Sequence, residues 1–390
     1  MSATQLLVQL IAIPSQNPMG RDAPAAEFGE SRLAEFVEGV CRSWGFATAV
    51  QVVERGRPNV IAWIEGTGRS SEATLLWDAH LDTVSAEGMT VAPFAAARSG
   101  NRILGRGACD VKGGMAAMMT AAARLADQPR ATRPSLILSF TVNEEHGFSG
   151  VRALPLLLRE LPLAFPGAAI VLEPTELDLV VVHKGVVRWP CHAIGRAAHS
   201  SRPEEGVNAI YRMADALPVI ARHAGEVLAE RMGDSRCGPA TLSVGTIQGG
   251  TSVNVVPDHC TIEIDRRLVQ GESPDGARSE LIAFLAHHGF ADLVHDPPTM
   301  QAPPLGESDS ALTSILSRQA NAIGDAGRRI GAPYATNAAF LASAGIPAVV
   351  FGPGAIAQAH TADEYIEIEQ LDLAAEILYR TAIEFASRAS

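Results

Sequence analysis

The segment TLLWDAHLDTVSAEGMTVAPFAAARSGNRILGRGACDVKGGM, residues 74–115, holds the pattern from which the architecture of this chain can be predicted. Its apolar start, residues 74–77, predicts a buried strand that stops at Asp78. His80 follows at once, and Asp110 lies in a glycine-flanked loop before a helical pattern begins. We therefore expect both side chains in loops at the ends of regular elements, where open α/β sheets place their chemistry.

His80 alone is weak evidence for a metal site, because a lone histidine is more often a structural residue than a ligand. Asp82, two residues later, favours a ligand, since a metal-bound histidine usually donates its other ring N–H to a carboxylate. The turn residues Ser99-Gly100-Asn101 predict a hairpin between His80 and Asp110.

The composition excludes several classes of protein. The chain has 390 residues, enough for two domains, and its 47% hydrophobic and 19% charged residues fit a well-cored globular protein. A formal net charge of −12 argues against a nucleic acid or an anionic membrane as partner. No apolar run approaches the ~20 residues that span a bilayer, and no basic segment suggests a signal peptide. The five scattered cysteines predict free thiols in a reducing cytoplasm.

Histidine and acidic residues recur where apolar strands end. Residues 135–142, 168–172 and 346–351 predict further buried strands, each followed by such a residue. Strands that alternate with helices predict an α/β fold with a mainly parallel central sheet, whose carboxyl ends share one edge. The candidate ligands at this edge are His80, Asp110, Glu145, Glu173 and His360. Two histidines and three carboxylates suit a pair of zinc-type ions with one bridging carboxylate.

The middle of the chain has a different order of predicted strands and helices. Strands at 185–194, 241–247, 255–268 and 291–295 and helices at 207–231 and 274–288 are predicted. Their order, β-α-β-β-α-β, is that of the ferredoxin-like motif. We therefore expect residues 1–184 and 300–390 to form a catalytic metal-binding domain. Residues 185–299 would be an inserted lid and dimerisation domain, whose open sheet edge could pair with its copy.

The chain contains a series of short motifs in a fixed order. In the outer segments these are His80-Leu81-Asp82-Thr83-Val84, Gly105-Arg106-Gly107 with Asp110 and Lys112-Gly113, Glu144-Glu145, Glu173-Pro174-Thr175, Gly352-Pro353-Gly354, Ala359-His360 and Asp363-Glu364-Tyr365. In the middle segment they are Ala198-His199-Ser200-Ser201, Gly249-Gly250, Asn254-Val255-Val256-Pro257 and Asp265-x-Arg267. Together they resemble the two-metal amidohydrolase and peptidase family of acetylornithine deacetylase, succinyl-diaminopimelate desuccinylase, aminoacylase and glutamate carboxypeptidase. The resemblance implies a zinc-aminopeptidase-like catalytic domain.

The resemblance also implies a specific role for each candidate residue. One ion would be held by His80, Asp110 and Glu173, and the other by Asp110, Glu145 and His360. Both ions would be divalent, with zinc expected and cobalt able to substitute. Glu144 would be the general base that takes a proton from the bridging water, and Asp82 would orient His80.

For the inserted segment the resemblance implies contacts with the substrate. His199 would reach the active site of the partner subunit of a homodimer and stabilise the oxyanion, while Asn254 and Arg267 would meet a substrate carboxylate. An ion pair between Arg267 and Asp265 is the alternative for that arginine. The implied reaction removes the acyl group from an N-acyl amino acid, a small molecule with a free carboxylate. A dipeptidase or carboxypeptidase of the same family is the alternative.

Three further considerations bear on this assignment. Relatives often carry an acidic residue where this chain has Asn337, so any charge preference read at that position has changed here. A metal-independent hydrolase with a Ser or Cys nucleophile is disfavoured, because no Gly-x-Ser-x-Gly elbow is present and the carboxylates cluster. A catalytically silent relative would have lost a ligand or the base, and none is lost.

Overall fold

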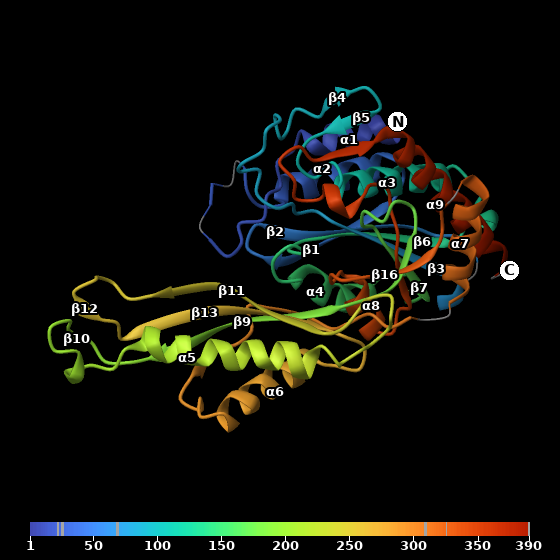
Figure 1. The fold of residues 1–390 in the computed structure, drawn as a ribbon. Helices are drawn as coiled ribbons and strands as arrows, with labels where there is room; N and C mark the ends of the chain where they lie inside the picture. Colours follow the sequence, from blue (N-terminus) through green and yellow to red (C-terminus); the bar gives the residue numbers. More distant parts are fainter. Residues whose placement is uncertain (22, 25–26, 68–69, 308–309, 325, 389–390) are drawn as a thin grey trace. The chain divides into compact units, whose positions relative to one another are not determined.

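The computed structural model describes residues 1–21, 23–24, 27–67, 70–307, 310–324 and 326–388 (Figure 1). The chain divides into two compact units. The outer unit comprises Met1–Val181, Glu307–Ile330 and Thr336–Ser390, and the inserted unit comprises Val182–Gly306 and Gly331–Ala335.

The outer unit is built on an eight-stranded sheet with the order β1-β2-β6-β3-β7-β17-β8-β16. The strands are β1 (Ala47–Glu54), β2 (Arg57–Ile64), β3 (Thr74–His80), β6 (Ser135–Thr141), β7 (Ala168–Val171), β8 (Leu179–His183), β16 (Arg329–Ala332) and β17 (Ala348–Val350). The four neighbours β6, β3, β7 and β17 are parallel, whereas β1, β2 and β8 pair antiparallel. The predicted α/β fold with a parallel central sheet is therefore confirmed.

Helices cover both faces of this sheet, which explains why its central strands are apolar throughout. Every residue of β3, β6 and β7 is buried. In Figure 1 α1 (Ala3–Ile11), α2 (Ser31–Ser43), α3 (Lys112–Ala126) and α9 (Ile368–Arg388) lie over one face, and α4 (Ser149–Leu158) and α8 (Ala338–Ser343) over the other. The helix α7 (Ala311–Ile323) packs against α9.

The helix α3 packs so closely that only glycine fits at one position. A Cβ atom on Gly113 would lie 2.4 Å from Ile366 Cδ1 and 2.5 Å from the carbonyl oxygen of Ala108. The methionines Met115, Met118 and Met119 are fully buried in the same core. Because α3 begins two residues after Asp110, this packing fixes the position of the loop that carries Asp110.

The strand β3 runs three residues further than predicted. His80 lies in the ladder opposite Thr141 of β6, so it ends a strand and does not lie in a loop. Asp78 can remain in the buried strand because its carboxylate accepts hydrogen bonds from Ser139 Oγ at 2.5 Å and Asn337 Nδ2 at 2.8 Å. The predicted hairpin is confirmed as β4 (Ala97–Ser99) and β5 (Arg102–Leu104), and β18 (Tyr365–Glu367) pairs with β5.

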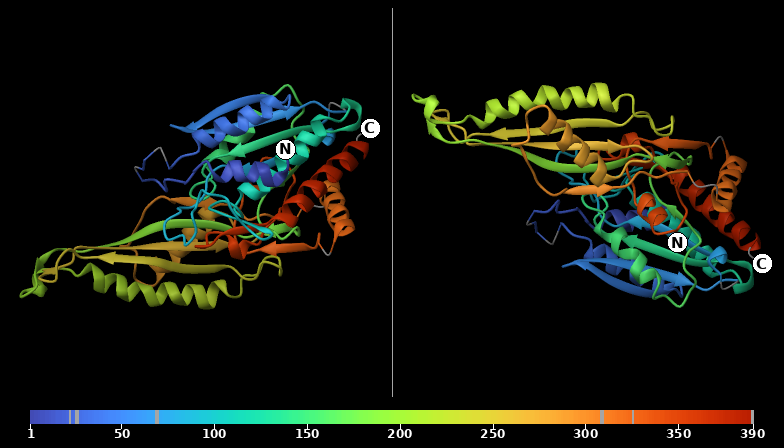
Figure 2. Two further views of the ribbon diagram at one scale, coloured as in Figure 1. Left: turned by 90° about the horizontal axis from the view of Figure 1, so that it is seen from above. Right: turned by 90° about the horizontal axis from the view of Figure 1, so that it is seen from below.

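The inserted unit has its own sheet, in the order β11-β13-β9-β14, with β15 also paired to β9. Its strands are β9 (Gly185–Ile194), β11 (Thr241–Gly249), β13 (His259–Leu268), β14 (Val294–His295) and β15 (Met300–Ala302). The helices α5 (Ala209–Arg222) and α6 (Pro274–His287) cover one face of this sheet (Figure 2). The chain order is therefore β-α-β-β-α-β. A short ladder pairs β10 (Ala198–His199) with β12 (Val255–Val256).

Two predicted elements of the inserted unit were too long. The helix expected over 207–231 is an α-helix only as far as Arg222. A π-helical segment, His223–Leu228, follows it and contains Gly225, a poor helix former. The strand expected over 291–295 is reduced to Val294–His295. All five cysteines are free, as expected, and all are buried. In the part of the chain that the structure describes, no helix has the length and apolar character needed to cross a membrane.

Candidate metal centre

The structure brings all five predicted ligands to one edge of the outer sheet. His80 ends β3, Glu145 and Glu173 follow β6 and β7, Asp110 precedes α3, and His360 lies in the loop between β17 and β18. They form two sets that share Asp110. The sets are His80, Asp110 and Glu173, and Asp110, Glu145 and His360; within each set the ligand atoms lie within 4.8 Å of one another. The geometry thus has the form expected for two ions with one bridging carboxylate.

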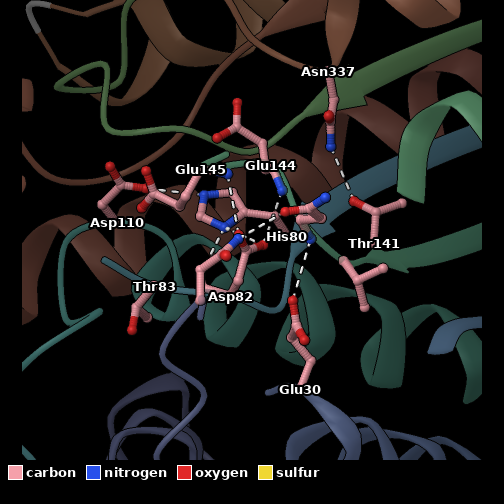
Figure 3. A network of polar contacts seen from close by, with 12 residues as sticks. Glu30, His80, Asp82, Thr83, Asp110, Thr141, Glu144, Glu145 and Asn337 are labelled. Atoms are coloured by element: carbon pink, nitrogen blue, oxygen red, sulfur yellow. Dashed lines mark hydrogen bonds and ion pairs between the residues drawn. The ribbon is translucent and has the colours of Figure 1, made fainter. Parts of the chain in front are cut away.

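Asp110 presents one carboxylate oxygen to each set. Its Oδ1 lies 3.0 Å from His80 Nε2, and its Oδ2 lies 3.3 Å from His360 Nε2. His360 Nε2 also lies 3.3 Å from Glu145 Oε1. Figure 3 shows His80, Asp110 and Glu145 grouped together with Glu144 beside them.

The glutamates of this cluster are buried beside other negative charges. Burial raises the pKa of Glu144 and of Glu173 well above the ordinary range, and neighbouring carboxylates add to the rise. The pKa of Glu145 is also raised, first by burial and then by the charge of Asp110. Protons are therefore lost from these carboxylates less readily than from exposed glutamates.

The pKa values of the two histidines are raised and that of Asp110 is lowered, because these groups pair with each other. Burial would lower the pKa of His80, but its contacts with Asp110 and Asp82 hold that pKa well above the usual value. The hydrogen bonds of His360 with Asp110 and Glu145 raise its pKa to about 11. Burial would raise the pKa of Asp110, yet His360 and His80 hold it below its ordinary range.

The donor set fits divalent cations. Imidazole nitrogens and carboxylate oxygens are ligands that zinc-type ions accept, and the two sets supply both. A bound cation would replace protons on the histidines and on the glutamates whose pKa is raised. Its charge would then neutralise the buried carboxylates.

Asp82 lies next to His80 but holds more than the imidazole. His80 Nδ1 is 2.9 Å from the carbonyl oxygen of Asp82 and 3.6 Å from its carboxylate. The carboxylate accepts hydrogen bonds from the backbone N–H groups of Glu144 and Glu145, both at 3.1 Å, and from Asn17 Nδ2 at 2.7 Å. Asp82 therefore ties the two glutamates to the end of β3 (Figure 3).

Asn143, directly before Glu144, has a left-handed backbone with φ of 63°, which residues other than glycine rarely adopt. Its side chain stabilises this corner by donating to Ser149 Oγ at 2.9 Å and to Glu54 Oε1 at 3.2 Å. Its Oδ1 accepts from Asn17 Nδ2 at 2.9 Å. The direction in which Glu144 and Glu145 leave β6 is thus set by hydrogen bonds from three separate segments.

A buried ion pair supports the same corner. Glu30 accepts two hydrogen bonds from the Arg57 guanidinium, at 2.5 and 2.8 Å, and one from the backbone N–H of Asn143 at 3.2 Å. The Glu30 side chain is fully buried and that of Arg57 is 9% exposed. Such a bidentate pair in a low-dielectric interior resists displacement, so it anchors the backbone before Glu144.

Asn337 is buried and 1% exposed. Its Nδ2 donates to Asp78 Oδ2 at 2.8 Å and to Thr141 Oγ1 at 2.9 Å (Figure 3). Among the described residues, no hydrogen bond reaches Asn337 Oδ1. In this conformation Asn337 contacts the carboxyl ends of β3 and β6.

The three predicted substrate contacts lie in the inserted unit. His199 is exposed, and its Nδ1 pairs with Ser201 Oγ at 2.7 Å. Asn254 is exposed and accepts a hydrogen bond from Ser252 Oγ at 2.5 Å. Arg267 pairs with Asp265 through Nε at 2.7 Å and Nη2 at 3.1 Å, which is the ion pair weighed as the alternative.

Several residues that shape the centre were not assigned from the sequence. Glu364 belongs to the motif Asp363-Glu364-Tyr365, whose role the sequence does not reveal, yet it accepts the backbone N–H of Asp110. Asn17 and Glu30 carried no signal, because Asp82 and Asn143, which they contact, lie far away in the chain. A polar residue directly before Glu144-Glu145 was the one local hint for Asn143.

Comparisons with known proteins find similarity over nearly the whole chain. The model of peptidase family M20/M25/M40 matches residues 76–384. An acetylornithine deacetylase of Myxococcus xanthus is 31% identical over 334 residues, 84% of each chain. A second acetylornithine deacetylase, from Salmonella paratyphi B, is 28% identical over 387 residues, 96% of each chain. The solved structure of an M20 family metallo-carboxypeptidase from Sulfolobus solfataricus has a TM-score of 0.82 at 17% identity, with 99% of this chain and 100% of that chain covered.

The pKa shifts predict how the stability of the metal-free protein depends on pH. Glu144, Glu145 and Glu173 hold protons in the folded state after the unfolded chain has lost them near its ordinary pKa of 4.5. The stability that these protons confer is complete below that pKa and is lost as the pH rises through the raised values. His360, raised from 6.5 to about 11, acts in the same direction at higher pH.

The melting temperature of the metal-free protein should therefore fall from about pH 5 to about pH 8 relative to that of the metal-loaded protein, because bound cations replace the protons. Differential scanning calorimetry of both forms across this range is the measurement. Asp82 and Asp110, whose pKa values are lowered, do not titrate in this window. Parallel curves for the two forms would contradict the prediction.

Proposed function

Since this chain belongs to peptidase family M20/M25/M40, whose model covers residues 76–384, we propose that it is a two-metal deacylase of N-acyl amino acids. That it is a metal-dependent hydrolase of amide bonds follows from the family itself. The observation that carries the proposal is the pair of ligand sets that share Asp110. The acyl amino acid as substrate is supported by two acetylornithine deacetylases among the relatives, at 31% and 28% identity.

In this proposal His80, Asp110 and Glu173 hold one divalent ion, and Asp110, Glu145 and His360 hold the other. Zinc is the proposed metal, because imidazole and carboxylate ligands suit it, with cobalt as a substitute. When bound, such ions polarise the scissile carbonyl and make water a better nucleophile at neutral pH. The remaining steps fall to side chains of the chain.

Glu144 is the proposed general base. Its backbone N–H donates to Asp82, and its side chain belongs to neither ligand set. It would take a proton from the attacking water and return it to the amine nitrogen that leaves. Burial, then the charge of Glu173, raises its pKa, which favours a group that must both accept and release a proton near neutral pH.

Recognition of the substrate carboxylate is assigned to Arg267 and Asn254. The contact of Arg267 with Asp265 uses Nε and Nη2, and its side chain is 26% exposed, so Nη1 is the atom proposed to meet a ligand. A guanidinium and a carboxylate form a charge-assisted hydrogen bond with defined geometry. A dipeptide also carries a carboxylate, so a dipeptidase or carboxypeptidase activity is an outcome of the test below.

We further propose a cytoplasmic homodimer in which His199 acts on the partner subunit's substrate. The free, buried cysteines support a reducing compartment. The outer strand β11 offers an edge for pairing, and Ile247 on it and Val253 beyond it are exposed. His199 lies in an exposed two-residue strand, where its ring is accessible to a second chain.

The first test separates Glu144 from Glu145. Metal analysis of wild type after mild dialysis should approach two ions per chain, as two ligand sets require. Glu144→Ala should keep both ions while kcat falls by about two to four orders of magnitude, because only proton transfer is lost. Glu145→Ala should instead lose one ion. Full activity with one ion per chain, or a fully active Glu144→Ala, would sink the assignment.

The second test addresses the dimer. A His199→Ala chain and a Glu144→Ala chain are mixed and allowed to exchange subunits, which native mass spectrometry can verify. One site of each mixed dimer then holds both an intact base and an intact His199, so part of the activity should return. Each variant alone, carried through the same exchange, is the control. No recovery despite proven exchange would place His199 in its own subunit's site or outside the mechanism.

The third test concerns the substrate. The metal-loaded protein is assayed against N-acyl amino acids, their carboxamides and dipeptides. N-acyl amino acids should give the highest kcat/KM, and the carboxamides, which lack the anion, should be poor substrates. Equal turnover of acid and carboxamide would exclude a carboxylate contact, and turnover of dipeptides alone would replace the deacylase proposal with a peptidase.

The same substrates are then given to Arg267→Ala. Loss of one charge-assisted contact should lower kcat/KM for the acids by roughly 30- to 1000-fold and leave the carboxamides nearly unchanged. Arg188→Ala is the matched control, because Arg188 also contacts Asp265, at 2.6 Å, from the neighbouring strand. If both variants behave alike, the effect arises from disturbing Asp265 and Arg267 does not bind substrate.

A further inference from the structure

Glu364 is a buried carboxylate that belongs to neither ligand set, and it is 1% exposed. Its Oε1 accepts the backbone N–H groups of Cys109 at 2.8 Å and Asp110 at 3.1 Å. Its Oε2 accepts the backbone N–H of Gly107 at 3.1 Å and Arg106 Nη1 at 2.7 Å. Both oxygens are thus occupied by the segment that carries Asp110.

The same contact joins two loops that are far apart in sequence. Glu364 lies four residues after His360, and its own carbonyl oxygen accepts the backbone N–H of Gly105 at 3.0 Å. The ladder between β5 and β18, with Tyr365 opposite Leu104, continues directly from this point. The loop of Asp110 and the loop of His360 are therefore held together by one side chain and a short strand pair.

Both loops need such support. His360 has a φ of 63°, a left-handed backbone that residues other than glycine seldom adopt. Gly107 has a φ of 82°, and a Cβ atom there would lie 2.9 Å from Thr83 Cγ2. Without the carboxylate, three buried backbone N–H groups and Arg106 Nη1 would lose their acceptor, which is costly in a protein interior.

We propose that Glu364 is a positioning residue that sets the distance between Asp110 and His360, and thereby the affinity of the second ligand set. That set takes two of its three members from the loops that Glu364 joins, whereas the first set takes only Asp110 from them. A displacement of one loop against the other should therefore weaken the second ion more than the first. The inference rests on the proposed two-ion site.

The experiment is a Co²⁺ titration of metal-free protein, followed by calorimetry and by the visible absorption of the bound cobalt. Glu145→Ala and Glu173→Ala assign each binding step to its ligand set, because each removes a ligand from one set alone. Glu364→Gln should lower the affinity of the second set by about 10- to 100-fold, the range seen when partners of metal ligands are removed. The fall at the first set should be smaller.

Glu367→Gln is the matched control. Glu367 lies three residues further on and pairs with Arg102 at 3.3 Å, but both side chains are more than two-fifths exposed. An exposed pair of this kind contributes little, so both affinities should stay at their wild-type values. Glu364→Asp is the second variant in case Glu364→Gln does not fold. It keeps the charge and withdraws the carboxylate by one methylene, and should weaken the second set in the same sense.

The outcomes separate the inference from the function on which it rests. If wild type binds fewer than two cobalt ions, the two-ion site and the inference both fail. If wild type binds two, and Glu364→Gln or Glu364→Asp weakens both sets equally or neither, only the inference is overturned. An equal loss is what a general loosening of the fold would give. A selective loss at the second set supports the positioning role.

Discussion

Buried negative charge is the constraint on which the rest of the outer unit depends. Asp78, Asp82, Asp110, Glu144 and Glu173 are all buried around the carboxyl ends of neighbouring parallel strands. An ionised carboxylate in a protein interior is costly unless hydrogen bonds or cations compensate it. Asp78 and Asp82 receive several hydrogen bonds each, but the ligand carboxylates face mainly His80 and His360. Divalent cations would compensate this charge, which otherwise depends on the two histidines and on bound protons.

A second group of carboxylates holds the first group in place. Asp82 accepts the backbone N–H groups of Glu144 and Glu145, Glu30 accepts that of Asn143, and Glu364 accepts that of Asp110. In each case the acceptor contacts the backbone, so the side chains of the candidate residues Asp110, Glu144 and Glu145 stay available. The arrangement is strong because each such bond is charge-assisted and each acceptor is buried. Acidic residues of the chain thus fix the loops that carry the candidate ligands.

The sequence was sufficient to predict the sheet and the convergence of the ligands, because both follow from local patterns. Apolar runs followed by His80, Glu145 and Glu173 place these residues at one edge once the strands are parallel. The supporting contacts could not be predicted from the sequence, because they join residues that are distant in the chain. Asn17 and Asp82 are 65 positions apart, and Glu364 and Asp110 are 254 positions apart. Hydrogen bonds of this kind leave no periodic signal. His80 was misplaced in a loop because Asp78 looked like the end of a strand, although Ser139 and Asn337 satisfy it inside the sheet.

Asn337 illustrates how a contact changes the meaning of a substitution. The sequence suggested that a neutral residue here would alter which charge the substrate carries, if the position reads the substrate. The side chain instead donates to Asp78 Oδ2 at 2.8 Å and is 1% exposed. An acidic residue at 337 would bring a second carboxylate against Asp78, and like charges at that distance disfavour each other strongly in a buried site. Asn337 is therefore accounted for by its hydrogen bond with Asp78, which lies two residues before His80.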